Sequence, residues 1–402
     1  MKRGTIFAAI MMSALVTSLP AAGTKKASPG PAAAANGIAF RFYSEEAAKP
    51  GNIFFSPYSI RTAFSMAYEG ARGKTAREIA AVFSFPAKAS ELRKSLSALA
   101  KDLSAAAAGA RFTQANSFWA QEGYKFLPAY LKVLRGSYGA EANQADFKNN
   151  AEEARAKINA WTEKRMDGKI KDLFPEGSLN QLSRLVLVNA VYFKGTWRAP
   201  FSKAMTADAD FTKPGGEKVK VKMMTTAANL QADYLENDAL QALRLPYKGG
   251  LSMLVLLPRA GKSLAETEKG LGPEKLDAIR KGLTGQEVKV FLPRFAFSSG
   301  YTLNDALAGL GMPLAFTDGA DFSGMDGTEK LYIQKAVHKA FIEVNEEGTE
   351  AAAATGISMG VKSINFDFAT FRADRPFLFF IEDAKTGLVL FMGRLENPEP
   401  NP

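Results

Sequence analysis

Residues 346–363 read EEGTEAAAATGISMGVKS and join two apolar segments without a compact turn signal between them. A connection of this length without secondary structure of its own is uncommon and is often functional. No residue from Leu314 to Arg375 is proline, so every residue of the segment can donate a backbone hydrogen bond, as a strand inside a sheet must. The sequence therefore allows the 346–363 segment to become a strand.

The two faces of this segment differ in polarity when it is extended, because side chains alternate between the faces of a strand. One face carries small and apolar residues: Thr349, Ala351, Ala353, Thr355, Ile357 and Met359. The other, which suits solvent, carries Glu350, Ala352, Ala354, Gly356, Ser358 and Gly360. The segment could enter a sheet with no charge on its buried face. The alternatives are an alanine-rich linker, or a short helix capped by Thr349.

Lys362 is the only basic residue between Lys339 and Arg372, and Ser363 follows it. Proteases with an acidic specificity pocket, such as trypsin, cleave after an exposed basic residue. The pattern therefore marks the bond between Lys362 and Ser363 as one that a trypsin-like enzyme would attack.

The composition excludes several kinds of active site. The 402 residues include no cysteine and one histidine, His338, and carry a formal net charge of +10. Disulfides, thiolate metal sites, cysteine nucleophiles and histidine-cluster metal sites are thereby excluded. A serine hydrolase would have to use His338, which lies in an apolar strand-like segment, and no Gly-x-Ser-x-Gly motif accompanies it. We predict no enzymatic activity, no metal and no cofactor.

The first residues have the pattern of a secretory signal peptide. Lys2 and Arg3 precede an uncharged run from Ile6 to Leu19, and small residues follow it. The run is shorter than the roughly 20 residues that span a bilayer. We expect a signal peptide over residues 1–22, a flexible lead over 23–36, a folded domain over 37–402, and a protein that is secreted to the exterior or the periplasm.

Helical patterns dominate the first half of the chain and strand patterns the second. Ser56-Pro57 is a helix-start signal, and residues 151–166 have helical periodicity before Gly168. Strands are predicted over residues 185–193, 251–257, 288–292, 340–344, 377–382 and 388–393. With no linker-like composition shift after residue 36, this order predicts one α+β domain with helices packed on large, mostly antiparallel sheets.

Lys218, Lys220 and Lys222 alternate along one predicted strand and would place three ammonium groups on one face. Such a face could hold a polyanion such as a glycosaminoglycan, although a solvated strand face is the usual meaning of a charge run. No aromatic residues are interleaved with these lysines, so nucleic-acid binding is not expected.

Motifs along nearly all of the mature chain resemble those of the serpin family. In chain order they are NIFFSPYSI (52–60), ANS (115–117), VNAVYFKGTW (188–197), LPY (245–247), GADFSGM (319–325), AVHKA (336–340), EEGTEAA (346–352), DRPF (374–377) and FMGR (391–394). The resemblance implies a monomeric protein of the serpin fold with an exposed reactive-centre loop formed by the 346–363 segment.

The resemblance also implies an inhibitory member, because the hinge consists of small residues. The hinge residues are Glu346, Gly348, Thr349, Glu350, Ala351, Ala352, Ala353 and Ala354. The family's usual spacing puts the cleaved bond fourteen positions after Gly348, between Lys362 and Ser363, in a loop of antithrombin-like length. Cleavage after Val361 by elastase-like enzymes, or after Met359 by chymotrypsin-like enzymes, is the open alternative.

The activity that the resemblance implies is that of a suicide substrate for a trypsin-like serine protease. The acyl-enzyme would be trapped when residues 348–362 insert as a new strand of a metastable main sheet. Ser56, Ser59, Asn189 and His338 would form a polar cluster, the shutter, that controls sheet opening. Trp197, Arg294 and Glu346 would form the breach where insertion begins, with Glu346 paired to Arg294. A non-inhibitory serpin that acts as a binding or chaperone protein is the alternative function.

Overall fold

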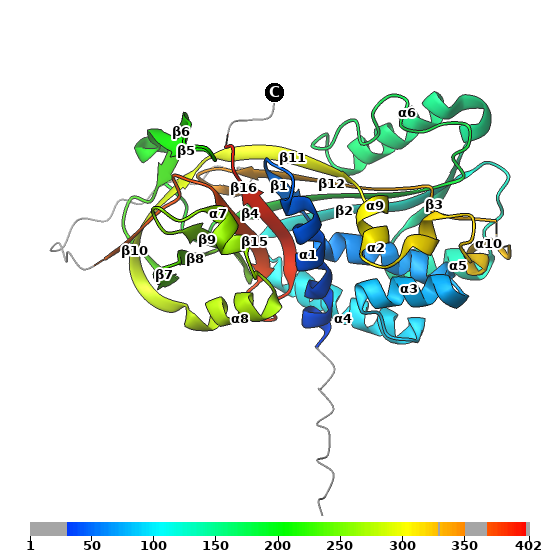
Figure 1. Ribbon diagram of the computed structural model, residues 1–402, viewed down its shortest axis with the longest axis horizontal. Coiled ribbons are helices and arrows are strands. Elements are labelled where there is room, and N and C mark those ends of the chain that lie inside the picture. Colours follow the sequence, from blue (N-terminus) through cyan, green and yellow to red (C-terminus); the bar gives the residue numbers. More distant parts are fainter. Residues whose placement is uncertain (1–29, 329, 350–367, 399–402) are drawn as a thin grey trace, which may run out of the picture.

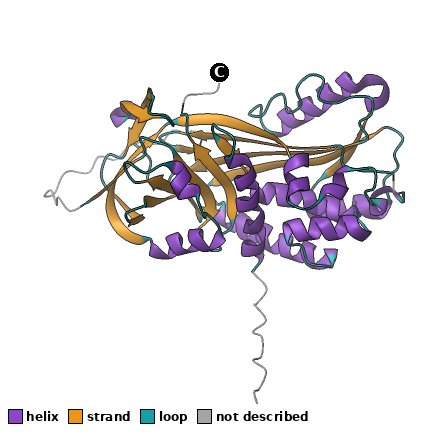
Figure 2. Cartoon of the chain, in the orientation of Figure 1, coloured by secondary structure: helices purple, strands orange, loops and turns teal. Residues whose placement is uncertain are grey.

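The computed structural model describes residues 30–328, 330–349 and 368–398, and its helices and strands follow the order expected from the sequence (Figures 1 and 2). The helices are α1 (Pro31–Ala47), α2 (Pro57–Gly70), α3 (Gly73–Phe83), α4 (Ala89–Ala106), α5 (Pro128–Val133), α6 (Phe147–Arg165), α7 (Leu264–Glu268), α8 (Pro273–Gly282), α9 (Asn304–Gly309) and α10 (Ser323–Asp326). Short helical turns of other types are η1 (Leu134–Tyr138), η2 (Lys203–Met205) and η3 (Pro313–Phe316).

The strands form two sheets. They are β1 (Ile53–Phe55), β2 (Ala110–Gln121), β3 (Glu141–Ala145), β4 (Leu185–Thr196), β5 (Ala207–Thr212), β6 (Lys218–Thr225), β7 (Leu230–Glu236), β8 (Leu240–Pro246), β9 (Leu251–Pro258), β10 (Thr284–Pro293), β11 (Phe295–Thr302), β12 (Lys335–Val344), β13 (Gly348–Thr349), β14 (Ala369–Arg372), β15 (Phe377–Asp383) and β16 (Val389–Leu395). The larger sheet has the order β1-β16-β15-β9-β8-β7-β10-β6-β5, with β14 also paired to β10.

The six-stranded sheet has the order β11-β12-β4-β2-β3, and the short strand β13 also pairs with β4. Its two central strands, β4 and β12, are parallel and pair directly over residues 335–341 and 186–192. Most other neighbours in the two sheets are antiparallel, as the sequence predicts. The α+β prediction is therefore confirmed.

Helices cover both faces of the six-stranded sheet, because β4 is apolar on each face. Leu185 and Leu187 join the cluster that contains Ile60 and Phe64 of α2. Val186 and Val188 join a second cluster with Ile158 of α6 on the other face. A strand buried on both sides reads as a continuous apolar run, which is why residues 185–193 are recognisable in the sequence.

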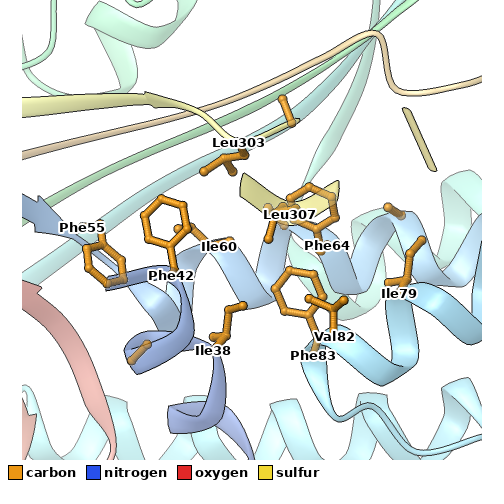
Figure 3. Close-up of a cluster of buried hydrophobic side chains, with 14 of the residues drawn as sticks. Ile38, Phe42, Phe55, Ile60, Phe64, Ile79, Val82, Phe83, Leu303 and Leu307 are labelled. Atoms are coloured by element: carbon orange, nitrogen blue, oxygen red, sulfur yellow. The ribbon is translucent and has the colours of Figure 1, made fainter. Parts of the chain in front are cut away.

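The largest core cluster lies between α1, α2, α3 and α9 (Figure 3). Phe42, Phe64 and Phe83 are fully or almost fully buried there. Burial of each such side chain stabilises the fold by about 1.5–3 kcal/mol. This packing fixes α2, whose first turn carries two of the predicted site residues.

Helix α1 corrects the expectation of a flexible lead over residues 23–36, because the helix begins at Pro31. Proline suits the first helical position, and the alanines that follow favour the helix. Asn36 is buried, its Nδ2 donates to Gly387 O (2.7 Å), and its Oδ1 accepts from Val389 N (2.8 Å). The folded domain therefore begins before residue 37. The expected signal peptide, residues 1–22, lies outside the described residues.

None of the helices in the described ranges combines the length and the apolarity that a membrane crossing needs.

Candidate functional site

The 346–363 segment begins in a tight turn that brings the chain back beside strand β4. Asn345 Oδ1 accepts hydrogen bonds from the backbone N–H groups of Glu347 (3.1 Å) and Gly348 (3.2 Å). Gly348 and Thr349 then pair antiparallel with Thr196 and Gly195 at the end of β4. The first two residues after the turn are thus already a strand of the six-stranded sheet.

Gly348 is required by this geometry. Its φ is +145°, a backbone conformation that residues with a side chain rarely adopt. A Cβ atom at this position would lie 2.0 Å from Gly195 O and 2.8 Å from the Cα of Thr196. Gly348 is a hinge residue by the family resemblance, and the structure shows the close backbone approach that excludes other residues here.

Beyond this entry point the sheet is closed. Strands β4 and β12 pair directly through seven residue pairs, from Lys335↔Val186 to Phe341↔Tyr192. No strand lies between them over these residues. Any further insertion of the 346–363 segment would have to separate β4 from β12.

Residues 197–206, which we call the clasp, hold the turn through its backbone. Trp197 donates from Nε1 to Asn345 O (3.0 Å) and from its backbone N to Glu347 O (2.9 Å). The backbone N of Phe201 donates to Glu346 O (2.8 Å). The Trp197 ring is almost fully buried and stacks on Tyr247 with centroids 4.3 Å apart. The clasp thus fixes the place where the segment enters the sheet.

The carboxylates of the turn also bind the clasp, which corrects the predicted pairing of Glu346 with Arg294. Thr206 Oγ1 donates to Glu346 Oε1 (2.9 Å), and Lys203 pairs with Glu347. Arg294 is exposed and forms no ion pair with Glu346. The pair was expected from the family resemblance alone, but the chain turns at Asn345 and points Glu346 toward residue 206. Lys203 and Thr206 were not predicted, and their sequence carries no signal for this role.

The structure brings together the four residues predicted as the shutter. Ser56, Ser59, Asn189 and His338 are all fully buried where the first turn of α2 meets β4 and β12. Asn189 Nδ2 donates to Ser59 Oγ (2.7 Å), and Ser56 Oγ caps α2 by accepting from Ser59 N (3.0 Å). His338 and Asn189 are paired residues in the parallel ladder. Register and helix capping together therefore build the cluster.

His338 is neutral, with the proton on Nδ1. Its Nε2 accepts from the backbone N–H of Ser56 (3.0 Å), so that nitrogen is unprotonated. Nδ1 is therefore the donor to Asn189 Oδ1. Burial lowers the pKa of His338 to about 3, while its hydrogen bond with Asn189 acts in the opposite direction. The imidazole bridges β12, β4 and α2 with no free nitrogen for catalysis.

Two members of this cluster were missed in the sequence. Asn116 of β2 accepts from Asn189 Nδ2, and Tyr301 of β11 stacks on the His338 ring with centroids 6.1 Å apart. The hydroxyl of Tyr301 accepts from Phe54 N (3.1 Å), and burial raises the pKa of that hydroxyl to about 12. Asn116 lies within the family-like motif at residues 115–117, and this motif could have identified it as a member of the cluster. No pattern in the sequence identifies Tyr301.

The predicted polyanion face is largely neutralised. Lys220 pairs with Asp210 (2.7 Å) and Lys222 with Asp208 (2.9 Å), both across the β5–β6 ladder. Opposite charges facing each other across strands stabilise the ladder and leave little net charge.

The remaining predicted residues lie outside the described ranges. These are Lys362 and Ser363 of the predicted cleavage bond, the alternatives Met359 and Val361, and the hinge residues Glu350, Ala351, Ala352, Ala353 and Ala354. Of Thr349 only the backbone is described.

Comparisons with known proteins match nearly all of the described chain to one family. The family model described as serpin (serine protease inhibitor) matches residues 33–398. A serpin-like protein of Thermococcus kodakarensis is 42% identical over 375 residues, 91% of this chain and 85% of that protein. Leukocyte elastase inhibitor of Homo sapiens is 40% identical over 356 residues, 87% of this chain and 93% of that protein. The crystal structure of Serpin48 from Tenebrio molitor has a TM-score of 0.83 at 32% identity and covers 91% of this chain and 97% of its own.

Proposed function

The chain belongs to the serpin family, and from this we propose that it inhibits trypsin-like serine proteases as a suicide substrate cleaved between Lys362 and Ser363. The observation that carries the proposal is the pairing of Gly348 and Thr349 with β4. The segment that would insert is thus already aligned with the strand beside which it would insert, in the antiparallel direction.

In this mechanism the protease supplies the chemistry and the serpin supplies a conformational change. The enzyme attacks the Lys362 carbonyl and forms an acyl-enzyme. Residues 348–362 then extend β13 along β4 while β12 separates from it. A strand of about a dozen residues gains hydrogen bonds worth roughly 0.5–1.5 kcal/mol each, so insertion releases on the order of ten kcal/mol. The attached protease is carried along and distorted before it can deacylate.

The two described clusters take different parts in this change. The clasp and Gly348 hold the start of the new strand at the C-terminal end of β4. The His338–Asn189 contact lies across the β4–β12 ladder, which must open. We propose that the clasp and Gly348 guide entry of the 346–363 segment into the sheet. The His338–Asn189 contact resists separation of β4 from β12. Both act mechanically and neither touches the reacting bond.

The similarity to leukocyte elastase inhibitor favours a second candidate for the target. Cleavage after Val361 would suit an elastase-like protease, and cleavage after Met359 a chymotrypsin-like one. A non-inhibitory serpin that binds or chaperones other molecules is the third candidate, against which the run of small residues after Gly348 counts.

Export belongs to the same proposal and rests on residues 1–22 alone. Amino-terminal sequencing of the protein recovered from its native cells would give a start after residue 22. A start at Met1 would contradict secretion through a cleaved signal peptide.

Incubation with trypsin tests the function. We expect an adduct that survives denaturing electrophoresis, with Ser363 as the new amino terminus of the released fragment. Lys362→Glu should abolish the trypsin adduct, since trypsin cannot accept an acid at that position, whereas Lys330→Glu, outside the segment, should leave it intact. Cleaved serpin with fully active trypsin and no adduct would refute inhibition. The same incubation with elastase tests the second candidate. Cleavage after Val361 would give a released fragment whose new amino terminus is Lys362.

A further inference from the structure

A cleft of about 490 Å³ lies between α7, α8 and the connection from β7 to β8 (Figure 1). Its volume is within the range of pockets that hold small molecules. None of its described lining residues belongs to the clasp or to the buried cluster around Asn189. The cleft is thus a feature that the proposed function does not use.

Much of the lining is apolar. Leu235 of β7, Leu240 of β8, and Ala278 and Ile279 of α8 line the cleft, and Leu240 and Ile279 are buried. An apolar ligand that fills the cleft is stabilised by the hydrophobic effect, because its own surface and that of these side chains leave water.

The charged residues of the lining balance one another. Lys262 and Lys275 are cations, and Asp238 and Glu266 are acids, so the described lining carries no net charge. Lys262 and Glu266 pair with each other (3.8 Å). A charged ligand would gain from two of these groups and lose to the other two, so charge complementarity favours an uncharged molecule.

One hydroxyl in this lining has no hydrogen-bond partner. Thr267 of α7 is 5% exposed and lines the cleft. Its Oγ1 forms no hydrogen bond within the described part of the chain, although its backbone oxygen accepts one from Lys275 Nζ (3.0 Å). Oγ1 is not sealed from solvent as the unsatisfied atoms of the core are, and the cleft is the space that this side chain borders. The hydroxyl is therefore available to a ligand.

Lys275 of α8 supplies a second free donor at the same place. Its Nζ donates to Thr267 O (3.0 Å) and to Lys269 O (3.1 Å), which uses two of the three hydrogens of an ammonium group. Lys275 is half-buried and forms no ion pair with a described residue. Because Nζ already contacts the backbone of Thr267, the free donors of the two residues are neighbours.

We propose that this cleft binds a small uncharged amphiphile, an apolar chain that ends in one hydroxyl or carbonyl oxygen. The chain covers Leu235, Leu240 and Ile279, and the oxygen accepts hydrogen bonds from Thr267 and Lys275. Buried polar groups in native proteins are nearly always hydrogen-bonded, and this ligand gives the Thr267 hydroxyl its partner. The site does not depend on protease inhibition, so either proposal can fail without the other.

Calorimetric titration of the intact protein tests the site with two probes, 1-octanol and 2-octanone, each kept below its solubility limit. The two probes distinguish a hydroxyl from a carbonyl ligand. We expect saturable one-to-one binding of at least one of them. Octanoate should bind about fivefold more weakly or worse, because its charge faces Asp238 and Glu266.

Two variants test the placement of the ligand. Ala278→Trp fills the cleft from an exposed position of α8 and should weaken binding of the better probe about tenfold or more. Ala160→Trp, at an exposed position of α6, is the matched control and should leave the affinity unchanged. Thr267→Val keeps the shape of the side chain but removes the hydroxyl, and should weaken binding about threefold or more, as the loss of one hydrogen bond predicts.

Any of four results would overturn the proposal. These are no one-to-one binding of either probe, octanoate that binds as tightly as the better probe, Ala278→Trp that binds no more weakly than Ala160→Trp, and Thr267→Val with unchanged affinity. If Ala278→Trp does not fold, the other three measurements still decide, because Thr267→Val removes no hydrogen bond within the described part of the chain.

Discussion

The middle of strand β4 and its end hold two clusters of opposite character. Around Asn189 the four predicted polar side chains are fully buried and bond one another across α2, β4 and β12. Around Gly195 and Thr196 the contacts run mainly through backbone atoms of a turn, and one of the three partner side chains from the clasp, Lys203, is exposed. The first arrangement resists separation of β4 from β12, and the second holds β13 against the end of β4.

Of the substitutions at these two clusters, replacement of Gly348 should have the largest effect on inhibition. In Gly348→Ala the new Cβ would meet Gly195 O at 2.0 Å, and the positive φ adds about 1–3 kcal/mol of strain. Pairing with β4 should be lost, and the number of serpin molecules consumed per trypsin inhibited should rise about tenfold or more, a change that corresponds to about 1.4 kcal/mol.

The matched control for this variant is Gly285→Ala in β10. A Cβ there meets nothing within 4 Å, so inhibition should be unchanged. Normal stoichiometry in Gly348→Ala would show that the backbone pairing at the end of β4 is not needed for insertion.

The buried cluster in the middle of β4 should make stability depend on pH. His338 has a pKa of about 3 in the folded protein and about 6.5 when unfolded. The unfolded chain therefore binds the extra proton between these values, and stability falls as pH drops below about 6.5. At pH 5 the loss from this group alone is about 2 kcal/mol relative to pH 7.5.

Urea unfolding at pH 7.5 and pH 5 measures this loss, with His338→Asn as the reference for all other groups. The unaltered protein should lose about 2 kcal/mol more than the variant between the two pH values. Equal losses in the two proteins would contradict a neutral, buried His338.

Substitutions of the clasp side chains Thr206 and Lys203 should have the smallest effects, and these should appear in the stability of the turn. Thr206→Val removes the donor to Glu346 and should weaken the held turn by about 1–2 kcal/mol. Lys203→Met should weaken the turn by a similar amount, because the lysine is 65% exposed but the Glu347 side chain that it pairs with is 8% exposed and loses its ion-pair partner. Hydrogen exchange at the Gly348 amide reports both. Unchanged exchange at the Gly348 amide in both variants would show that these side chains do not hold the turn.

The same comparison explains how far the sequence could predict the structure. The buried cluster was predicted from the family resemblance. The sequence itself marks only Ser56 as a helix cap and His338 as part of an apolar strand, and the register of that strand with β4 sets the contact. The Glu346–Arg294 pair, expected from the family resemblance, was wrong because the turn at Asn345 directs Glu346 to Thr206. Thr206 and Lys203 come from a distant part of the chain, and no local pattern brings them to the turn.

Two other features lay beyond the local pattern. The alanine-rich run after Gly30 resembles a linker, but tertiary contacts of Asn36 with the β15–β16 connection hold it as a helix. Thr267 reads as an ordinary polar position of α7, and only its burial at the edge of a cleft identifies it as unusual.

The central claim is that β12 must separate from β4 for inhibition. The chain has no cysteine, so a single engineered disulfide can test this directly. Val191 and Ala340 face each other in the parallel ladder and are both fully buried, so Val191→Cys with Ala340→Cys would lock the two strands together. The oxidised variant should be cleaved by trypsin without forming an adduct, and reduction followed by removal of the reductant should restore trapping. Equal adduct yield from the oxidised and reduced forms would contradict the account.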